Sequence, residues 1–333
     1  MQGAAERTGI ESWFSVPEKQ DVLENIKTYV LMHVSPMNDL LPDRECYLKK
    51  LQAYIARMPS LSTTVIKVLE TCNDPNASAY DLKRVISLDP VLTGRVLKLI
   101  NSAYYSLGHP VSSLTRAIIL LGINNVKNLA LSFTILDNFK VKRTGQSFTA
   151  DEFWTHSLGV GVAAKALAAL KEVPSTMREE FFIAGLLHDL GKFPLQSQFP
   201  AEYYRAWNSA RQQETQLYQS EVRYLGFDHC AVGQMIARKW KLGISLIDSL
   251  SHHHHPDESP DESREFVSIV SLADQWANAF NIGTAGNYAP DHALLNDLSA
   301  KVGVDWSMLS NLCETVLCEI DKAKVFLEVV RND

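Results

Sequence analysis

Apolar residues along most of this chain recur three and four positions apart. Val65, Val68, Leu69 and Cys72 occupy positions i, i+3, i+4 and i+7 of one such stretch. Two later stretches repeat this spacing, and their apolar positions are Leu92, Val96, Leu99, Val162, Ala166 and Leu170. The period places apolar side chains on one face of a helix. Alternating runs of Val, Ile and Thr bounded by hairpin turns are absent, so the sequence predicts an all-α fold.

Proline-containing and polar stretches divide this helical pattern. Asp74-Pro75 and Asp89-Pro90 interrupt the first helical part, because proline restricts the residue before it. Polar, glycine-containing stretches at residues 141–147 and 283–287 are predicted boundaries. We therefore expect four parts: residues 1–40, unassigned apart from a possible helix over 21–32; residues 41–140, an amino-terminal helical half; residues 148–285, a second helical half; and residues 286–333, a helical cap.

Composition narrows the class of protein. The 333 residues are 46% hydrophobic and 21% charged with a formal net charge of −6, and no block of five basic residues occurs. We therefore expect neither nucleic acid nor a membrane surface as a partner. No apolar run reaches the length of a membrane span, and no secretory signal is evident at the start. The five cysteines lack Cys-x-x-Cys spacing, so neither disulfides nor a thiolate zinc site is predicted, and a cytoplasmic location is expected.

The dipeptide His188-Asp189 follows an apolar helical stretch at residues 181–187. Adjacent side chains on a helix diverge by about 100°, so both can reach one point only near a helix end. Gly191 is predicted to supply that end, because glycine readily takes a positive φ. A buried imidazole and carboxylate at such a position require a partner.

The distribution of histidines indicates a metal as that partner. Seven of the ten fall between residues 156 and 255, and the candidate acids beside them are Glu152, Asp189 and Asp274. Glu152 precedes His156 by one helical turn, and Asp274 ends an apolar stretch. Imidazole and carboxylate ligands together suit divalent iron, manganese or zinc.

In these residues the chain resembles the HD superfamily of metal-dependent phosphohydrolases. The family's ligands follow the order His, His-Asp, further His and Asp, and the matching residues here are His156, His188, Asp189 and Asp274. The resemblance extends to the second metal set of the binuclear members. His229 matches a His-x-x-x-Gly element that ends at Gly233, and His253-His254 matches a His-His pair before Pro256.

The amino-terminal part narrows the resemblance to the HDOD domain. The matching segments lie in order and at similar spacing from about Leu40 to about Phe280, and they are residues 58–61, 73–75, 85–92, 99–105 and 117–122. The resemblance implies an output module of bacterial signalling. HDOD domains often lack metal ligands, whereas this chain has matches to the whole set. The markers Asp89-Pro90 and Asn101-Ser102-Ala103 are most simply a helix cap and a turn.

If two ions bind, the simplest assignment gives His156, His188, Asp189 and Asp274 to one and His229, His253 and His254 to the other. Asp189 would bridge them, since each imidazole nitrogen serves one metal. Two divalent ions make a shared water a nucleophile near neutral pH and neutralise charge on a phosphoryl oxygen. In this scheme Asp189 and Lys192 are the candidate catalytic residues, with Lys192 reaching a phosphate oxygen.

Several assignments stay open at this point. Glu152 is a third-ion ligand, as in some members of the related HD-GYP group, a partner of His156, or a surface acid. Lys192 matches the lysine of the HD-GYP His-Asp-x-Gly-Lys signature, or it complements the end of its helix. At most two of the four histidines at 252–255 are expected to be ligands, and a slip of one residue from His253-His254 is an alternative.

Two functions are compatible with this sequence. One is a signalling output protein that binds a protein partner, with a structural or sensory metal site. The other is a metal-dependent phosphohydrolase or phosphodiesterase acting on a nucleotide or another small phosphate. Cyclic di-GMP is not the expected substrate, because residues 256–262 lack the Gly-Tyr-Pro element of HD-GYP proteins and form an acidic loop instead.

Overall fold

Helices separated by short turns account for the whole fold of the described residues. The structure is a computed structural model, and it describes residues 44–74, 76–138, 147–287, 289–325 and 327–328. No strand occurs within these ranges, which confirms the predicted all-α class. The expected helix over 21–32, Pro75 and residues 141–146 of the expected boundary lie outside them.

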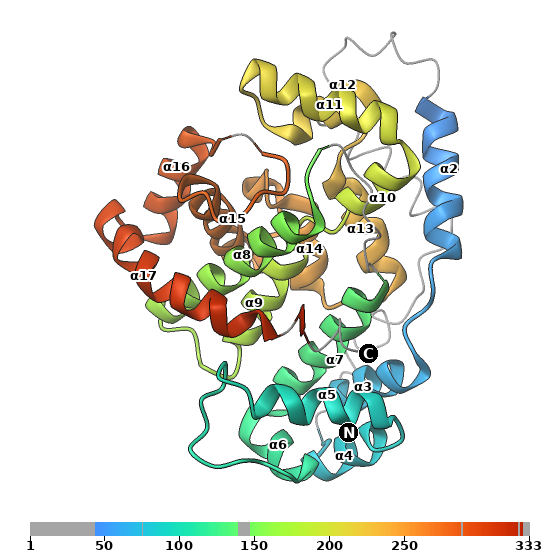
Figure 1. The fold of residues 1–333 in the computed structure, drawn as a ribbon, viewed down its shortest axis with the longest axis vertical. Helices are drawn as coiled ribbons and strands as arrows, with labels where there is room; N and C mark the ends of the chain where they lie inside the picture. The colour runs from blue at the N-terminus through green and yellow to red at the C-terminus, as the bar shows by residue number, and fades with distance from the viewer. Residues whose placement is uncertain (1–43, 75, 139–146, 288, 326, 329–333) are drawn as a thin grey trace, which may run out of the picture. The chain divides into compact units, whose positions relative to one another are not determined.

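Six helices precede the histidine-bearing part (Figure 1). They are α2 (Arg44–Arg57), α3 (Thr63–Asn73), α4 (Ala79–Ile86), α5 (Pro90–Ile100), α6 (Leu114–Leu121) and α7 (Ile123–Asn138). The fully buried Val68, Leu82, Ile86, Val96 and Ile118 contribute to their core. The helical period therefore marked buried positions such as Val68 and Val96, whereas Leu170 at the end of the third marked stretch is 43% exposed.

Two markers of this first part have local structural roles. Asp89 caps α5 by accepting a hydrogen bond from the Leu92 backbone N–H at 2.9 Å, and Pro90 begins the helix. The Asn101 side chain donates to the Val111 carbonyl and accepts from the Val111 N–H, at 2.8 and 2.6 Å. These bonds close the loop between α5 and α6, so cap and turn are the roles that the structure gives these residues.

The second part contains the histidine cluster. Its helices are α8 (Ala150–Leu170), α9 (Arg178–Leu187), α10 (Lys192–Gln198), α11 (Pro200–Gln213), α12 (Leu217–Leu225), α13 (His229–Lys239), α14 (Ile244–His252), the short 3-10 helix η3 (Pro256–Glu258) and α15 (Asp261–Ala279). Helices α8, α9, α14 and α15 pack against one another as the core of this part (Figure 1).

Close approach of α8 to α9 depends on two glycines. A Cβ added to Gly185 would lie 2.7 Å from the Gly161 Cα, and one added to Gly161 would lie 2.7 Å from the Phe182 carbonyl oxygen. Real Cβ atoms do not approach backbone so closely, so both positions need a residue without a side chain. This contact holds α8, which carries His156, against α9, which leads to His188.

The last helices, α16 (His292–Val302) and α17 (Trp306–Ala323), pack on α15 and α8 respectively. The Trp276 indole of α15 donates to the Leu309 carbonyl of α17 at 2.9 Å. Residues Leu41–Asp333 form one contact unit, and its division into halves and a cap stays a prediction.

A buried polar group joins the first helices to the second part. The Lys165 ammonium donates to Glu179 at 2.6 Å and to the Tyr104 hydroxyl at 2.8 Å, and the Tyr105 hydroxyl lies 3.2 Å from the same carboxylate. Glu179 is buried, and its charge is balanced by Lys165. This group fixes the loop after α5 against α8 and α9.

Among the described helices, none alone has both the length and the apolar composition of a membrane span. One pair, α6 with residues 123–137 of α7, meets these criteria only jointly and across a bend of 107°.

Candidate metal centre

His156 and Asp274 meet between α8 and α15. His156 Nε2 lies 3.1 Å from Asp274 Oδ1, although 118 positions separate the two residues. Two amides position the carboxylate: Asn278 donates to Oδ1 at 2.9 Å and Gln275 donates to Oδ2 at 3.0 Å. Both His156 and Asp274 are fully buried. The two ends of the predicted ligand order therefore lie side by side.

His188 and Asp189 lie where α9 ends, as predicted, but Gly191 does not end the helix through a positive φ. Its φ is −62°, within the right-handed helical region. A Cβ on Gly191 would lie 2.0 Å from the His229 carbonyl oxygen and 2.8 Å from the Gly233 N. Glycine is therefore needed because α13 crosses directly against this turn, so the local explanation from the sequence was wrong.

Asp189 occupies the middle of the cluster. Its Oδ2 lies 3.2 Å from His188 Nε2 and 4.0 Å from His156 Nε2, while its Oδ1 lies 3.1 Å from His229 Nε2 and 3.7 Å from His253 Nε2. Each oxygen thus faces a different group of imidazoles. This is the arrangement that a bridging carboxylate requires.

The remaining histidines gather on the other side of Asp189. His229 begins α13, whereas His253 and His254 follow the end of α14. His229 Nε2 lies 3.3 Å from His253 Nε2 and 3.1 Å from His254 Nε2. Of the four consecutive histidines, His253 and His254 are buried and His252 and His255 are half-buried. The structure therefore brings together the pair expected from the sequence.

Four of the imidazoles are held in the same way, through Nδ1. His156, His188 and His253 donate Nδ1–H to the backbone carbonyls of Ile282, Gly185 and Ser249, at 3.3, 2.7 and 3.0 Å. His229 Nδ1 lies 2.6 Å from the Glu221 carboxylate. A carbonyl can only accept, so Nδ1 carries the proton and a neutral ring presents the Nε2 lone pair. All four Nε2 atoms point into the cluster, which is how metal-binding histidines are oriented.

Burial and neighbouring charges shift the pKa values of the cluster strongly. Burial disfavours a charged His188, yet the adjacent Asp189 carboxylate outweighs this effect and raises the His188 pKa to about 9. Burial also disfavours charge on Asp189, but His188 and Lys192 hold its pKa well below the usual value. Burial lowers the His253 pKa to about 4, so its ring is neutral near pH 7. Protons on some imidazoles compensate for the carboxylates.

Unsatisfied atoms test whether a metal fits. His188 Nε2 and Asp189 Oδ1 are buried and form no hydrogen bond, although both lie close to other cluster atoms. Buried polar atoms normally have a partner, and these two face the same interior region. Three overlapping groups have donor atoms within 4.8 Å of one another: His156, His188 and Asp274; His188, Asp189 and His253; and His229, Cys230, His253 and His254. Divalent cations suit this donor set.

The cluster is enclosed. None of its five histidines and two aspartates is more than 5% exposed. The Tyr218 ring of α12 stacks on His254 at a centroid distance of 4.5 Å and an angle of 19°. Tyr218 also meets His255 edge-on at 5.2 Å. A substrate of nucleotide size reaches the cluster only if covering side chains move.

Lys192 lies inside the cluster rather than at its surface. It begins α10, is fully buried, and donates to Asp189 Oδ2 at 2.7 Å. In this position it neutralises one carboxylate charge and fixes the carboxylate orientation. Contact with a phosphate oxygen, the role predicted from the sequence, stays a prediction.

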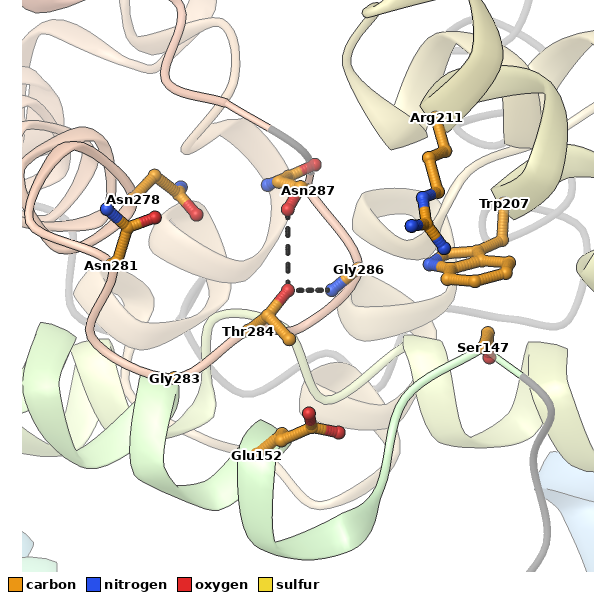
Figure 2. A pocket seen from close by; sticks show the side chains of 10 residues that line it. All are labelled: Ser147, Glu152, Trp207, Arg211, Asn278, Asn281, Gly283, Thr284, Gly286 and Asn287. Carbon is orange, nitrogen blue, oxygen red and sulfur yellow. Dashed lines mark hydrogen bonds between the residues drawn. The ribbon is translucent and has the colours of Figure 1, made fainter.

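Glu152 lies outside the cluster. Its carboxylate accepts from the backbone N–H and hydroxyl of Thr149, at 2.8 and 2.7 Å, and so completes the capping box of α8. The side chain is exposed and lines a pocket of about 380 Å³ with Trp207, Arg211 and Asn278 (Figure 2). Asn278 links this pocket to Asp274, but the Glu152 carboxylate belongs to none of the donor groups that converge among the described residues.

Glu221 and Cys230 were not singled out from the sequence as candidate site residues. Glu221 accepts from both the His229 ring and the His229 backbone N–H, the latter at 2.9 Å. A signal for it existed, because Leu217, Glu221 and Leu225 lie four residues apart and place one acid on the buried face of α12. Cys230 lies next to His229 and belongs to the same donor group.

Replacing Glu221 with glutamine is expected to weaken binding of the ion held by His229 more than binding of the ion held by His156, His188 and Asp274. A neutral amide orients the ring less firmly and lowers the basicity of Nε2, and losses of such partners cost about 10–100-fold in metal affinity. Titration of metal-free protein with zinc in competition with a chelator measures this change. Glu265 is exposed, so Glu265→Gln is the matched control and should leave the zinc affinity unchanged. Equal affinities of Glu221→Gln and wild type would contradict the orienting role.

The helical architecture and the buried histidine and aspartate groups define an HD-type protein, and these groups indicate a divalent metal. The HDOD domain model matches residues 58–256. This match covers more than half of the chain, so the protein belongs to the HDOD family. The resemblance noted in the sequence is thereby confirmed.

The chain is also similar to individual proteins, one of which carries the HDOD description. An HDOD domain protein of unknown function from Geobacter sulfurreducens is 26% identical with a TM-score of 0.67, and the match covers 84% of this chain and 97% of that one. A protein from Shewanella amazonensis SB2B, called a "Putative phosphohydrolase", shares the fold with 21% identity, a TM-score of 0.63 and coverage of 84% and 98%. An uncharacterized protein of Treponema pallidum (strain Nichols) is 25% identical over 219 residues, which are 65% of this chain and only 41% of that relative.

Proposed function

We propose that this protein is a signalling output protein of the HDOD type that carries a binuclear divalent metal site with a structural or sensory role. The observation that carries the proposal is the position of Asp189, whose two oxygens face two separate groups of imidazoles. His156, His188 and Asp274 would hold the first ion, and His229, His253 and His254 the second. Iron, manganese and zinc fit these ligands.

Because the site is enclosed, a structural or sensory role is better supported than catalytic turnover of a substrate. Every imidazole and carboxylate of the cluster is at most 5% exposed, and Tyr218 covers His254. A bound ion in such a place stabilises the fold that presents the protein's surface, because binding free energy becomes folding free energy. The proposed partner at that surface is another protein of a signalling pathway.

Hydrolysis of a small phosphate ester is the second candidate, and the central carboxylate favours it. Two divalent ions would supply Lewis acidity and an activated water between the two groups. Asp189 would then hold both ions in place, while Lys192 fixes Asp189 through their 2.7 Å hydrogen bond. The surrounding helices already limit access of bulk water to these atoms.

Elemental analysis of protein purified without a metal-affinity step tests the metal site. We expect about two equivalents of divalent metal per chain. Protein that contains less than about a tenth of an equivalent, and that takes up no added manganese, iron or zinc, would contradict the proposal.

A panel of phosphatase and phosphodiesterase substrates then separates the two functions. Under the output proposal, metal-loaded protein hydrolyses none of the nucleotides, cyclic nucleotides and model esters. Turnover that depends on added metal and disappears in Asp189→Asn would favour the hydrolase instead.

A further inference from the structure

Cys230 differs from the other cysteines of the chain in what surrounds its thiol. It directly follows His229 in the first turn of α13 and is fully buried. Its Sγ lies 3.7 Å from Nδ1 and 3.9 Å from Nε2 of His253. Cys72, by contrast, places its Sγ 3.8 Å from a backbone carbonyl, that of Ile123. The Cys230 thiol therefore faces nitrogen atoms of the candidate metal centre.

We propose that Cys230 Sγ is a direct ligand of the second ion, which makes this position a site of three imidazoles and one thiolate. The inference rests on the proposed metal site and adds a ligand to it. Each of His229, His253 and His254 offers one ring nitrogen and Cys230 offers Sγ, and these four donor atoms lie within 4.8 Å of one another. The thiol proton leaves to solvent as the sulfur–metal bond forms.

Distances between the donors fit a single small cation. Zinc bonds of about 2.0–2.1 Å to nitrogen and about 2.3 Å to sulfur imply tetrahedral separations of about 3.3 Å between nitrogens and about 3.6 Å between nitrogen and sulfur. The observed nitrogen separations are 3.1 and 3.3 Å, and the sulfur lies 3.9 Å from His253 Nε2 and 3.7 Å from its Nδ1. The nitrogens are therefore already spaced for one ion, whereas the thiol lies beside the His253 ring and must turn toward Nε2 to join them.

A thiolate makes the two halves of the centre chemically different. The first group, His156, His188 and Asp274, offers only nitrogen and oxygen, which also suit manganese. The second group gains a soft sulfur donor that favours zinc, cobalt or iron over manganese. Asp189 Oδ1, 3.1 Å from His229 Nε2, joins the second group as a fifth donor if it bridges. We therefore expect the two positions to retain different metals.

Cobalt substitution of the full chain tests the ligand. Metal-free protein loaded with Co²⁺ is expected to show a near-ultraviolet thiolate-to-cobalt charge-transfer band in addition to visible absorption. Cys230→Ser should lose this band, keep visible absorption from the histidines, and bind one of the two ions at least about 10-fold more weakly. The matched control is Cys72→Ser, which should keep the band because Cys72 contacts a carbonyl instead.

The outcomes separate this inference from the metal site on which it rests. Cobalt binding without the band, or a band that persists in Cys230→Ser, overturns the thiolate ligand and leaves the metal site intact. Failure of the wild type to bind cobalt or zinc overturns both. X-ray absorption of zinc-loaded wild type needs no variant, and absence of a sulfur neighbour at about 2.3 Å would also overturn the thiolate ligand.

Discussion

Asp189→Asn protein is expected to lose nearly all of its bound metal. The carboxylate lies between the two imidazole groups, and each of its oxygens is within 3.2 Å of a different histidine nitrogen. An amide keeps the shape but lacks the charge, and its NH₂ group cannot bind a cation. We expect metal content to fall from about two equivalents to below about 0.2. Elemental analysis, with Glu265→Gln as the control for neutralising an exposed acid, measures the change.

The same substitution is expected to destabilise the fold through Lys192. This ammonium is fully buried and donates to Asp189 at 2.7 Å, so Asp189→Asn leaves a buried charge without its counter-charge. Breaking one side of a buried ion pair costs about 3–5 kcal/mol. Urea denaturation of metal-free protein measures this loss.

The double variant Asp189→Asn with Lys192→Met separates the two effects. Removing both charges should recover most of the stability but none of the metal. Metal content close to that of wild type in either variant would contradict the central role of Asp189. Unchanged stability of the single variant would show that Lys192 does not depend on this carboxylate.

Gly191→Ala is expected to have the second large effect, a loss of about 3 kcal/mol in the free energy of unfolding, the upper end of the usual cost of overpacking. The new Cβ would lie 2.0 Å from the His229 carbonyl oxygen and 2.8 Å from the Gly233 N. Both neighbours are backbone atoms, so α13 must move away from the turn that carries His188 and Asp189. Metal binding should fall as well, because His229 moves with α13.

Gly94 provides the matched control. It lies inside α5, is exposed, and has no atom within 4 Å of an added Cβ. Gly94→Ala should therefore raise stability by up to about 1 kcal/mol through helix propensity alone. Denaturant unfolding of both variants is the measurement, and similar stabilities for the two would refute the steric explanation.

Periodicity and residue order predicted the fold class and much of the site's composition. The spacing that marked Val65 and Val96 reports local helical structure, which depends on neighbours in sequence. The order His156, His188-Asp189, Asp274 pointed to residues that do converge. That these residues bind metal stays a prediction.

Neither the helical period nor the order of residues along the chain predicts contacts between distant segments. Gly191 is glycine because of a helix about forty residues later, and a local rule could assign only a turn. Cys230 was set aside because thiolate sites were sought as Cys-x-x-Cys pairs, whereas this thiol meets His253, which directly follows the end of another helix. For Glu152, a local pattern does indicate the helix-capping role in place of a metal-ligand role, because Thr149-x-x-Glu152 is the pattern of a capping box.

The stacking of Tyr218 on His254 bears on how metal enters and leaves the protein. With every donor covered, an ion exchanges only when this part of the fold opens, and such opening is rare in a stable core. The rate at which a bound ion leaves is then set by the rate of this opening, so ions that entered during folding would leave slowly.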